Sequence, residues 1–263
     1  MTTTNKSTPA FALHEVTVDF QSTRALDDVS LEISSGEHVA LIGPSGSGKT
    51  TLLRTLNGAQ PLTSGEVFAN GIALTGLASN ELRSIRRSIG WIPQSLGLVP
   101  NLRVIQNLML GSSGRASIWQ LLRKLTFPTR EDQLAALTHL DRVGIGEKLF
   151  ERTSSLSGGQ QQRVAIARTL FQNPTSILAD EPVSAVDPAR AVDLVKLLTE
   201  LATENGVSLV MSIHNLELAR RFFPRLIGLR SGKVVIDSHP DDLSPTEADS
   251  LFSLTESEIL DGE

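Results

Sequence analysis

The segment Gly43–Thr50, which reads GPSGSGKT, has the residue types and spacing of a phosphate-binding loop. An apolar run at Val39–Ile42 precedes it, and the pattern predicts a helix over Thr51–Leu56 after it. Glycines let consecutive backbone N–H groups turn toward phosphate oxygens, and the helix directs its positive end to the same point. We therefore predict a nucleotide site in which Lys49 reaches the β- and γ-phosphates and the Thr50 hydroxyl binds Mg²⁺. The residues expected to bind the nucleotide here are Gly43, Pro44, Ser45, Gly46, Ser47, Gly48, Lys49, Thr50 and Thr51.

Two acidic residues, Asp180 and Glu181, follow the apolar run Ile177–Ala179, which predicts a buried strand. Ligands of open α/β sheets bind at the carboxyl ends of the strands, where these acids emerge. Asp180 suits a Mg²⁺ ion held through a water, and Glu181 suits polarising an attacking water. An apolar run followed by two acids is a common strand end by itself. Together with the phosphate-binding loop it predicts a hydrolytic site.

The composition of the 263 residues excludes several classes of function. The 24 Lys and Arg against 29 Asp and Glu give a net charge of -5, which argues against a general nucleic-acid-binding protein. The absence of cysteine excludes disulfides, thiolate metal sites and cysteine nucleophiles. No apolar run approaches the ~20 residues that cross a bilayer. The Thr-rich start lacks the apolar stretch of a secretory signal, so we expect a soluble protein with a disordered lead-in at residues 1–10.

The remaining pattern predicts an α/β core with two inserted subdomains. Alternating apolar and polar residues predict a strand at Phe11–Phe20 and a shorter one at Val29–Ile33, and hairpin turn signals follow at 64–66 and 70–71. The stretch 81–168 has a mostly helical pattern. Strand-like runs return at Ile177–Ala179, Val207–Ile213, Leu226–Leu229 and Val234–Ile236, with helices between them.

Two segments have a charge bias of their own. Residues 80–130 hold eight basic residues and one acid, which indicates either a solvated helix face or a surface for a partner or anionic lipid head groups. Residues 234–263 hold nine acids and no Lys or Arg. We expect an acidic, solvated and partly disordered tail at residues 239–263.

Between the two predicted sites lies the pentapeptide LSGGQ at 156–160, followed by QQRVAIAR. Ser157 suits a helix N-cap, and the amides of Gly158 and Gly159 open a helix whose N-terminus is an anion site. With this segment the sequence resembles the ATP-binding subunits of ATP-binding cassette (ABC) transporters over roughly residues 11–236. The resemblance implies an α/β fold: a P-loop (RecA-like) core with an N-terminal antiparallel β subdomain and an inserted helical subdomain. The cassette would span residues 11–238, with the helical subdomain at about 95–168.

The same resemblance implies roles for individual residues. Gln94 resembles the Q-loop glutamine, which reaches Mg²⁺ and the attacking water, and His214 resembles the switch histidine that contacts the γ-phosphate. Asp187, in SAVD, resembles the D-loop residue that lines the dimer contact. Phe20 occupies the position of the aromatic residue that stacks on adenine, although a core position also fits it. Two copies would pack head to tail, each closing Ser157, Gly158, Gly159 and Gln160 on the γ-phosphate bound by the other.

The activity implied by the resemblance is Mg²⁺-dependent hydrolysis of ATP to ADP and phosphate, coupled to transport. The catalytic residues would be Lys49, Gln94, Glu181 and His214. Since the chain has no membrane span, we expect separate integral-membrane permease subunits as partners, an extracytoplasmic solute-binding protein as an indirect partner, and no nucleic acid. We expect a peripheral location at the cytoplasmic face of the inner membrane.

The cargo expectation comes from three further segments: LVPNL at 98–102, the stretch 111–131 with IWQLLR, and HNLELARR at 214–221. These are similar to the phosphonate-importer ATPases, so the resemblance implies import of phosphonate or a related oxoanion. Three alternatives stay open: a soluble ABC ATPase of repair or translation, a cassette of cell division or lipid handling, and an importer of a different cargo. The soluble cassettes usually carry long coiled-coil insertions or two cassettes per chain, neither of which occurs here.

Overall fold

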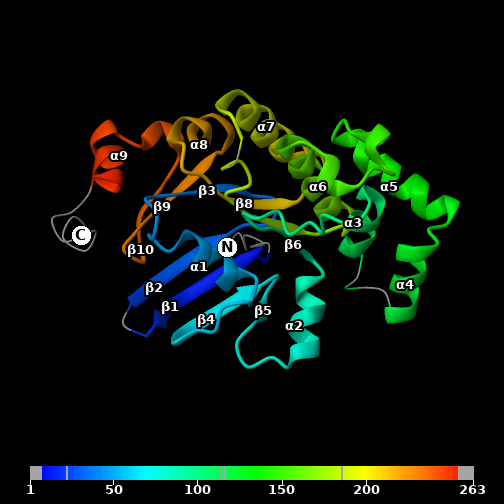
Figure 1. Cartoon of the computed structure of the whole chain (residues 1–263). Coiled ribbons are helices and arrows are strands. Elements are labelled where there is room, and N and C mark those ends of the chain that lie inside the picture. The colour runs from blue at the N-terminus through cyan, green and yellow to red at the C-terminus, as the bar shows by residue number, and fades with distance from the viewer. Residues whose placement is uncertain (1–7, 22, 113, 115–116, 185, 254–263) are drawn as a thin grey trace, which may run out of the picture.

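The computed structural model of the chain describes residues 8–21, 23–112, 114, 117–184 and 186–253. Within them the strands form two sheets (Figure 1). The smaller sheet is antiparallel, in the order β2-β1-β4-β5. Its strands are β1 (Phe11–Phe20), β2 (Thr23–Ile33), β4 (Ser64–Ala69) and β5 (Ile72–Ala73). The bounds of β1 are those that the alternating pattern predicted.

The larger sheet has the order β10-β9-β3-β8-β7-β6 and carries the predicted site at one edge. Its strands are parallel except for β10, which is antiparallel to β9. They are β3 (His38–Ile42), β6 (Ile89–Ile92), β7 (Ser176–Asp180), β8 (Ser208–Ser212), β9 (Arg225–Arg230) and β10 (Lys233–Ser238). The parallel strands therefore end at a common edge, as ligand-binding α/β sheets do.

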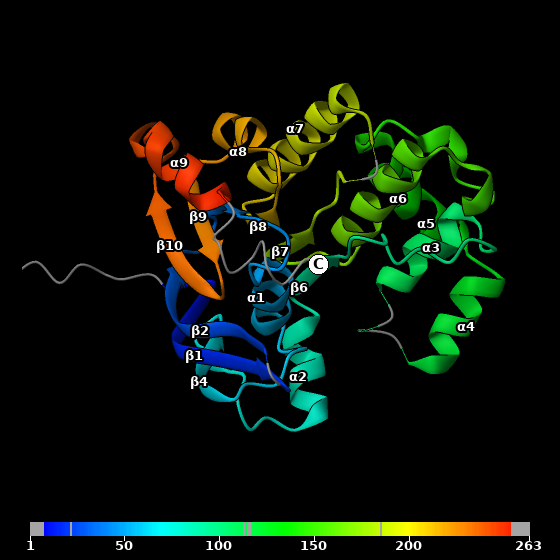
Figure 2. The same ribbon diagram turned by 60° about the vertical axis from the view of Figure 1, so that its left-hand side comes forward.

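The described residues form nine α-helices, several of which cover the larger sheet (Figures 1 and 2). Helices α3 to α6 gather at one end of the molecule, in green to yellow-green, and they lie in the stretch predicted to be helical except for the last three residues of α6. The helices are α1 (Lys49–Leu56), α2 (Ser79–Arg86), α3 (Val104–Gly111), α4 (Ile118–Thr126), α5 (Arg130–Arg142), α6 (Gly158–Phe171), α7 (Pro188–Glu204), α8 (Leu216–Phe222) and α9 (Pro245–Phe252). None of the helices in this part of the chain has the length and apolar character needed to cross a membrane.

Two hydrophobic cores lie on opposite faces of the larger sheet. Successive side chains of a strand point to opposite faces, and β3 divides its residues accordingly. Val39 and Leu41 pack with the antiparallel sheet and α1, whereas Ala40 and Ile42 pack with α3, α6, α7 and α8. The sheet is therefore covered on both faces, which explains why its parallel strands read as continuous apolar runs.

Two strands differ from the prediction. β6 (Ile89–Ile92) lies inside the stretch with the helical pattern, because pairing with β7 decides the conformation of so short an apolar segment. β2 begins at Thr23 and not at Val29. A register shift opposite Asp28, whose φ is 54°, lets the strand continue past two polar residues that interrupt the alternation.

The C-terminal segment packs against the rest of the molecule up to residue 253, in contrast to the solvated tail expected at 239–263. Leu243, Ala248 and Leu251 are buried and belong to the larger core. The acids of this segment stay exposed, and Glu247 forms a capping box with Ser244 at the start of α9. An acidic composition is therefore compatible with a packed helix here. Residues 254–263 and residues 1–7 of the predicted lead-in lie outside the described residues.

Candidate nucleotide site

The predicted phosphate-binding loop connects the end of β3 to α1, as its sequence context required. Gly48 has a φ of 107°, and a Cβ there would lie 2.5 Å from the carbonyl oxygen of Ala25. Gly43 has a φ of 143°, and a Cβ there would clash with the carbonyl oxygen of Leu229. Both positions therefore require glycine, because the loop packs closely between β2 and β9 in a backbone conformation that other residues rarely adopt.

Lys49, the first residue of α1, folds back over this loop. Its side chain is only 5% exposed, and Nζ donates to the carbonyl oxygens of Gly43 (2.9 Å) and Pro44 (2.8 Å). Burial lowers the pKa of Lys49 below its ordinary value, and the charges of Glu181 and Asp180 partly oppose this shift. The loop therefore holds a buried ammonium group whose hydrogen bonds, among the described residues, go to loop carbonyls and not to a carboxylate.

The loop also contains an unsatisfied polar group that fits a phosphate ligand. The Ser47 hydroxyl is buried and has no hydrogen-bond partner among the described residues. A buried hydroxyl without a partner is unfavourable, and a phosphate oxygen is an acceptor that this loop is shaped to receive. With Lys49 beside it, the donor set suits a polyphosphate.

The predicted acidic residues lie at this loop. The Thr50 hydroxyl, in the first turn of α1, donates to Asp180 Oδ1 at 3.0 Å. Asp180 ends β7 and is buried. Thr51, the next residue of α1, is half-buried and has no hydrogen bond of its side chain among those described. The end of β7 and the phosphate-binding loop are thus in direct contact.

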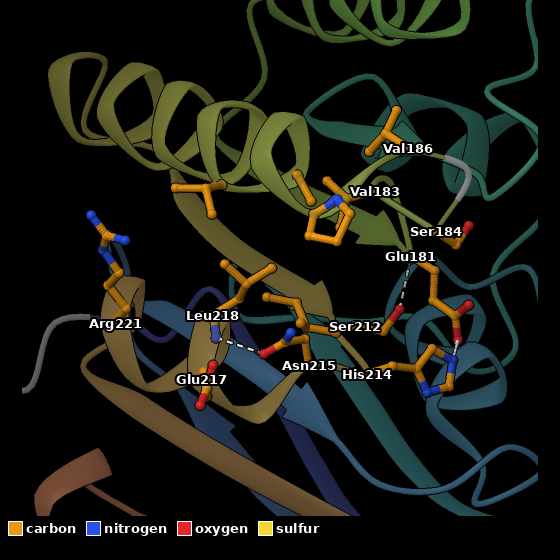
Figure 3. Close-up of a pocket in the computed structure, with 14 residues that line it drawn as sticks. Glu181, Val183, Ser184, Val186, Ser212, His214, Asn215, Glu217, Leu218 and Arg221 are labelled. Atoms are coloured by element: carbon orange, nitrogen blue, oxygen red, sulfur yellow. Dashed lines mark hydrogen bonds and ion pairs between the residues drawn. The ribbon is translucent and has the colours of Figure 1, made fainter.

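Three of the predicted residues meet at the Glu181 carboxylate. His214 Nε2 lies 2.5 Å from Glu181 Oε1, and Gln94 Nε2 donates to Glu181 Oε2 at 3.2 Å. These residues follow the neighbouring strands β8, β7 and β6, so the sheet brings them together. Figure 3 shows the side chains of Glu181 and His214 pointing toward one another. The Glu181 backbone has a φ of 46°, a strained conformation that occurs often at functional sites.

Ser212 belongs to this site and was not identified from the sequence. It is the last residue of β8 and is fully buried. Its hydroxyl donates to Asp180 Oδ1 at 3.0 Å and accepts from the Glu181 backbone N–H at 2.8 Å. A serine in an apolar strand matches no motif, and its position two residues before His214 is the signal that could have found it.

The LSGGQ segment is at the N-terminus of α6. Ser157 is the N-cap, and its hydroxyl accepts from the Gln160 N–H at 3.4 Å while Gln160 Oε1 accepts from the Ser157 N–H at 3.0 Å. The predicted N-cap is therefore correct, and the two residues form a capping box. A Cβ at Gly158 would meet no atom within 4 Å, so this end of the helix is open in a single chain. The hydrogen bonds of Ser157 and Gln160, among the described residues, stay at the start of α6.

The last two predicted residues lie away from these hydrogen bonds. Asp187 is the N-cap of α7, where its side chain accepts from the Arg190 N–H at 3.1 Å. Phe20, at the end of β1, is 46% exposed and therefore not a core residue. Of the segment SAVD, Ala185 lies outside the described residues.

Comparison with known proteins identifies the family of this chain. The family model described as ABC transporter matches residues 26–184, more than half of the chain. The chain belongs to the ABC transporter family. The predicted resemblance and the predicted cassette fold are thereby confirmed, and the chain is an ABC ATPase.

Relatives of this ABC ATPase match most of its length. It is 44% identical to the phosphonates import ATP-binding protein PhnC 2 of Synechococcus sp., over 87% of this chain and 84% of that protein. It is also 44% identical to the phosphate-import ATP-binding protein PhnC of Mycolicibacterium smegmatis, over 85% of this chain and 84% of that protein. Among solved structures, it is similar to the dimeric post-hydrolysis state of the ATP-binding cassette MJ0796 bound to ADP and Pi. That likeness has 35% identity and a TM-score of 0.74, and it covers 88% of this chain and 98% of the other.

Proposed function

We propose that this ABC ATPase hydrolyses Mg-ATP as a head-to-tail homodimer and drives an importer of phosphonate or a related phosphorus oxoanion. The observation that carries the catalytic part is that the end of β7 joins two contacts: Asp180 accepts from Thr50 of α1, and the adjacent Glu181 contacts His214, which follows β8. The cargo part is supported by the names of the relatives, which are import proteins for phosphonates and for phosphate.

The phosphate-binding loop would hold the β- and γ-phosphates. Lys49 now donates to two loop carbonyls, and phosphate oxygens would replace these acceptors while the Ser47 hydroxyl donates to another. Mg²⁺, when bound, would neutralise charge on the phosphates, held by Thr50 directly and by Asp180 and Gln94 near it. Phe20 would stack on the adenine, which its exposure permits.

Glu181 would activate the attacking water. Its carboxylate accepts a proton as the water oxygen bonds to the γ-phosphorus, and the bond from that phosphorus to the bridging oxygen breaks with its electron pair going to ADP. Gln94 and His214 now hold the two oxygens of this carboxylate, and so they would orient it toward the water. On nucleotide binding, His214 would also contact the γ-phosphate.

The second copy would complete each site. One chain has one phosphate-binding loop and one LSGGQ segment, so two complete sites need two chains. The N-terminus of α6 is open, and its capping box leaves Gly158 accessible, so this end would suit an anion. Closure of Ser157, Gly158, Gly159 and Gln160 on the partner's γ-phosphate, with Asp187 lining the contact, is supported by the dimeric state of MJ0796.

Coupling to transport needs proteins other than this chain. We infer permease subunits as direct partners and a location at the cytoplasmic face of the cell membrane, with a solute-binding protein as an indirect partner. The names of the relatives as import ATP-binding proteins support this inference.

Uptake by cells tests the import proposal. A strain that lacks this protein should not take up methylphosphonate as its sole phosphorus source, while growth on inorganic phosphate through other routes continues. The parent gene should restore uptake, and a Glu181→Gln copy should not, because import needs hydrolysis. Normal uptake of every phosphorus oxoanion in the deleted strain would remove the cargo assignment, and it would leave a different cargo or a cassette without import as the function.

A further inference from the structure

The Ser212 hydroxyl links the two carboxylates of the site. It donates to Asp180 Oδ1 (3.0 Å) and accepts from the Glu181 backbone N–H (2.8 Å), and Figure 3 shows the second of these bonds beside the Glu181–His214 contact. Because the Thr50 hydroxyl donates to the same Asp180 oxygen, a continuous chain of hydrogen bonds runs from α1 to the backbone of Glu181.

The Ser212 hydroxyl makes both bonds with a single atom group. A hydroxyl has one donor and accepting lone pairs, so it serves a carboxylate oxygen and an N–H group at once. The N–H of Glu181 belongs to a residue with a φ of 46°, and a strained backbone persists only where its surroundings hold it. Without the hydroxyl, this N–H loses its acceptor, and Asp180 Oδ1 loses one of the two hydroxyl donors that the described residues give it.

A second serine of β8 shows what a purely structural hydroxyl does. Ser208, four residues earlier, is also buried, and its hydroxyl accepts from the Gly36 N–H at 2.8 Å. Both serines therefore satisfy a backbone N–H at the same distance on the same strand. Ser212 alone of the two contacts the site, since Ser208 lies at the opposite end of β8.

We propose that Ser212 is a positioning residue for hydrolysis: it fixes the metal-side carboxylate of Asp180 and the water-side carboxylate of Glu181 relative to each other. The inference deepens the proposed ATPase function and rests on the roles proposed for these two acids. It does not depend on the cargo.

Three substitutions separate positioning from a structural role. Ser212→Ala removes both hydrogen bonds, and Ser212→Thr keeps the hydroxyl. The threonine adds one methyl group next to the cavity of about 420 Å³ between α7 and α8 that Ser212 helps to line (Figure 3). Ser208→Ala is the matched control. Four quantities are measured for each purified chain. They are kcat for ATP, the Tm, the affinity for metal-free ADP, and the Mg²⁺ concentration that half-saturates Mg-ADP binding, called the Mg²⁺ midpoint below.

For Ser212→Ala we expect kcat to fall about 10- to 100-fold and the Mg²⁺ midpoint to rise severalfold, the range typical of groups that orient metal-site ligands. The affinity for metal-free ADP should not change. Ser212→Thr should restore both quantities, and Ser208→Ala should lower the Tm while keeping them. If Ser212→Ala does not fold, Ser212→Cys takes its place. Its side chain is close in size to that of serine and forms only weak hydrogen bonds, so the same losses are expected.

Parent-like kcat and Mg²⁺ midpoint in Ser212→Ala or Ser212→Cys would overturn the inference, and so would equal losses in Ser208→Ala. An error in the role proposed for Glu181 can be told apart from an error in the role of Ser212. It would appear as hydrolysis by Glu181→Gln at the parent rate. An inactive Glu181→Gln together with an active Ser212→Ala would refute the positioning role alone.

Discussion

The Thr50 hydroxyl lies 3.0 Å from Asp180 Oδ1, although the two residues are 130 positions apart in the chain. This hydrogen bond joins the first turn of α1 to the carboxyl end of β7. It places the carboxylate suited to a metal beside the loop suited to phosphates, so charge neutralisation and phosphate binding can act on one nucleotide. The residues of the site lie at or just after the carboxyl ends of four neighbouring strands, β3, β8, β7 and β6.

Nucleotide affinity should depend on the protonation of Lys49. Burial lowers the pKa of Lys49 in the nucleotide-free chain, whereas an adjacent phosphate stabilises the charged form and raises the pKa again. Binding therefore takes up a proton in the pH range between these two values. We expect the affinity for ADP, measured from about pH 7 to about pH 10 around the ordinary lysine value, to fall as pH rises.

The control for this prediction is Lys49→Arg, because arginine stays charged throughout that range. Its ADP affinity should be lower than that of the parent yet nearly independent of pH. A parent chain whose affinity is constant over the range, or an equal slope in Lys49→Arg, would contradict the assignment of Lys49 to the phosphates.

The head-to-tail dimer predicts a specific cross-link. The chain has no cysteine, so cysteines introduced at Ser45 and Ser157 are the only thiols. Both positions are exposed in the single chain, and in the dimer the phosphate-binding loop of one copy meets the LSGGQ segment of the other. We expect an intermolecular disulfide that forms on addition of ATP and is visible on a non-reducing gel.

Cysteines at Ser45 and Ser84 provide the comparison, since Ser84 is an exposed residue of α2 outside the proposed contact. This pair should give no ATP-dependent product. Equal cross-linking by both pairs, or none by Ser45 with Ser157, would count against the dimer.

The packed C-terminal segment predicts a loss of stability on truncation of a single side chain. Leu251, in α9, is 1% exposed and belongs to the larger core. Leu251→Ala should lower the free energy of unfolding by about 2–5 kcal/mol, measured by urea denaturation. Phe252→Ala, at the adjacent and partly exposed residue, should have a much smaller effect. Equal effects of the two substitutions would mean that α9 does not pack as described.

Much of this fold could be predicted because local patterns coincide with tertiary structure. The alternation in β1 and the apolar runs of β3, β7 and β8 report burial on one or both faces of a sheet. β6 could not be predicted, since four residues carry too little pattern and pairing with β7 decides their conformation. The packing of α9 was obscured by the acids around it, because composition averages over the buried Ala248 and Leu251.

The sequence predicted most of the residues of the site, but not the contacts between their side chains. Motif spacing and strand ends indicated Lys49, Asp180 and Glu181, because the carboxyl ends of parallel strands meet at one edge. The contacts of His214 and Gln94 with a single carboxylate depend on side-chain conformations that no pattern encodes. Ser212 was missed for a related reason: a buried hydroxyl reveals its partners only when β7 and β8 are seen side by side.

The activation of water by Glu181 is tested most directly by the ATPase activity of Glu181→Gln. The amide keeps the size of the side chain and removes the charge and basicity that act on the water. We predict that turnover falls by at least about 100-fold while Mg-ATP binding is retained and an ATP-bound dimer accumulates. Glu200→Gln, at an exposed residue of α7 that pairs only weakly with Lys196 at 3.8 Å, should hydrolyse ATP like the parent. Hydrolysis by Glu181→Gln at the parent rate would contradict the account.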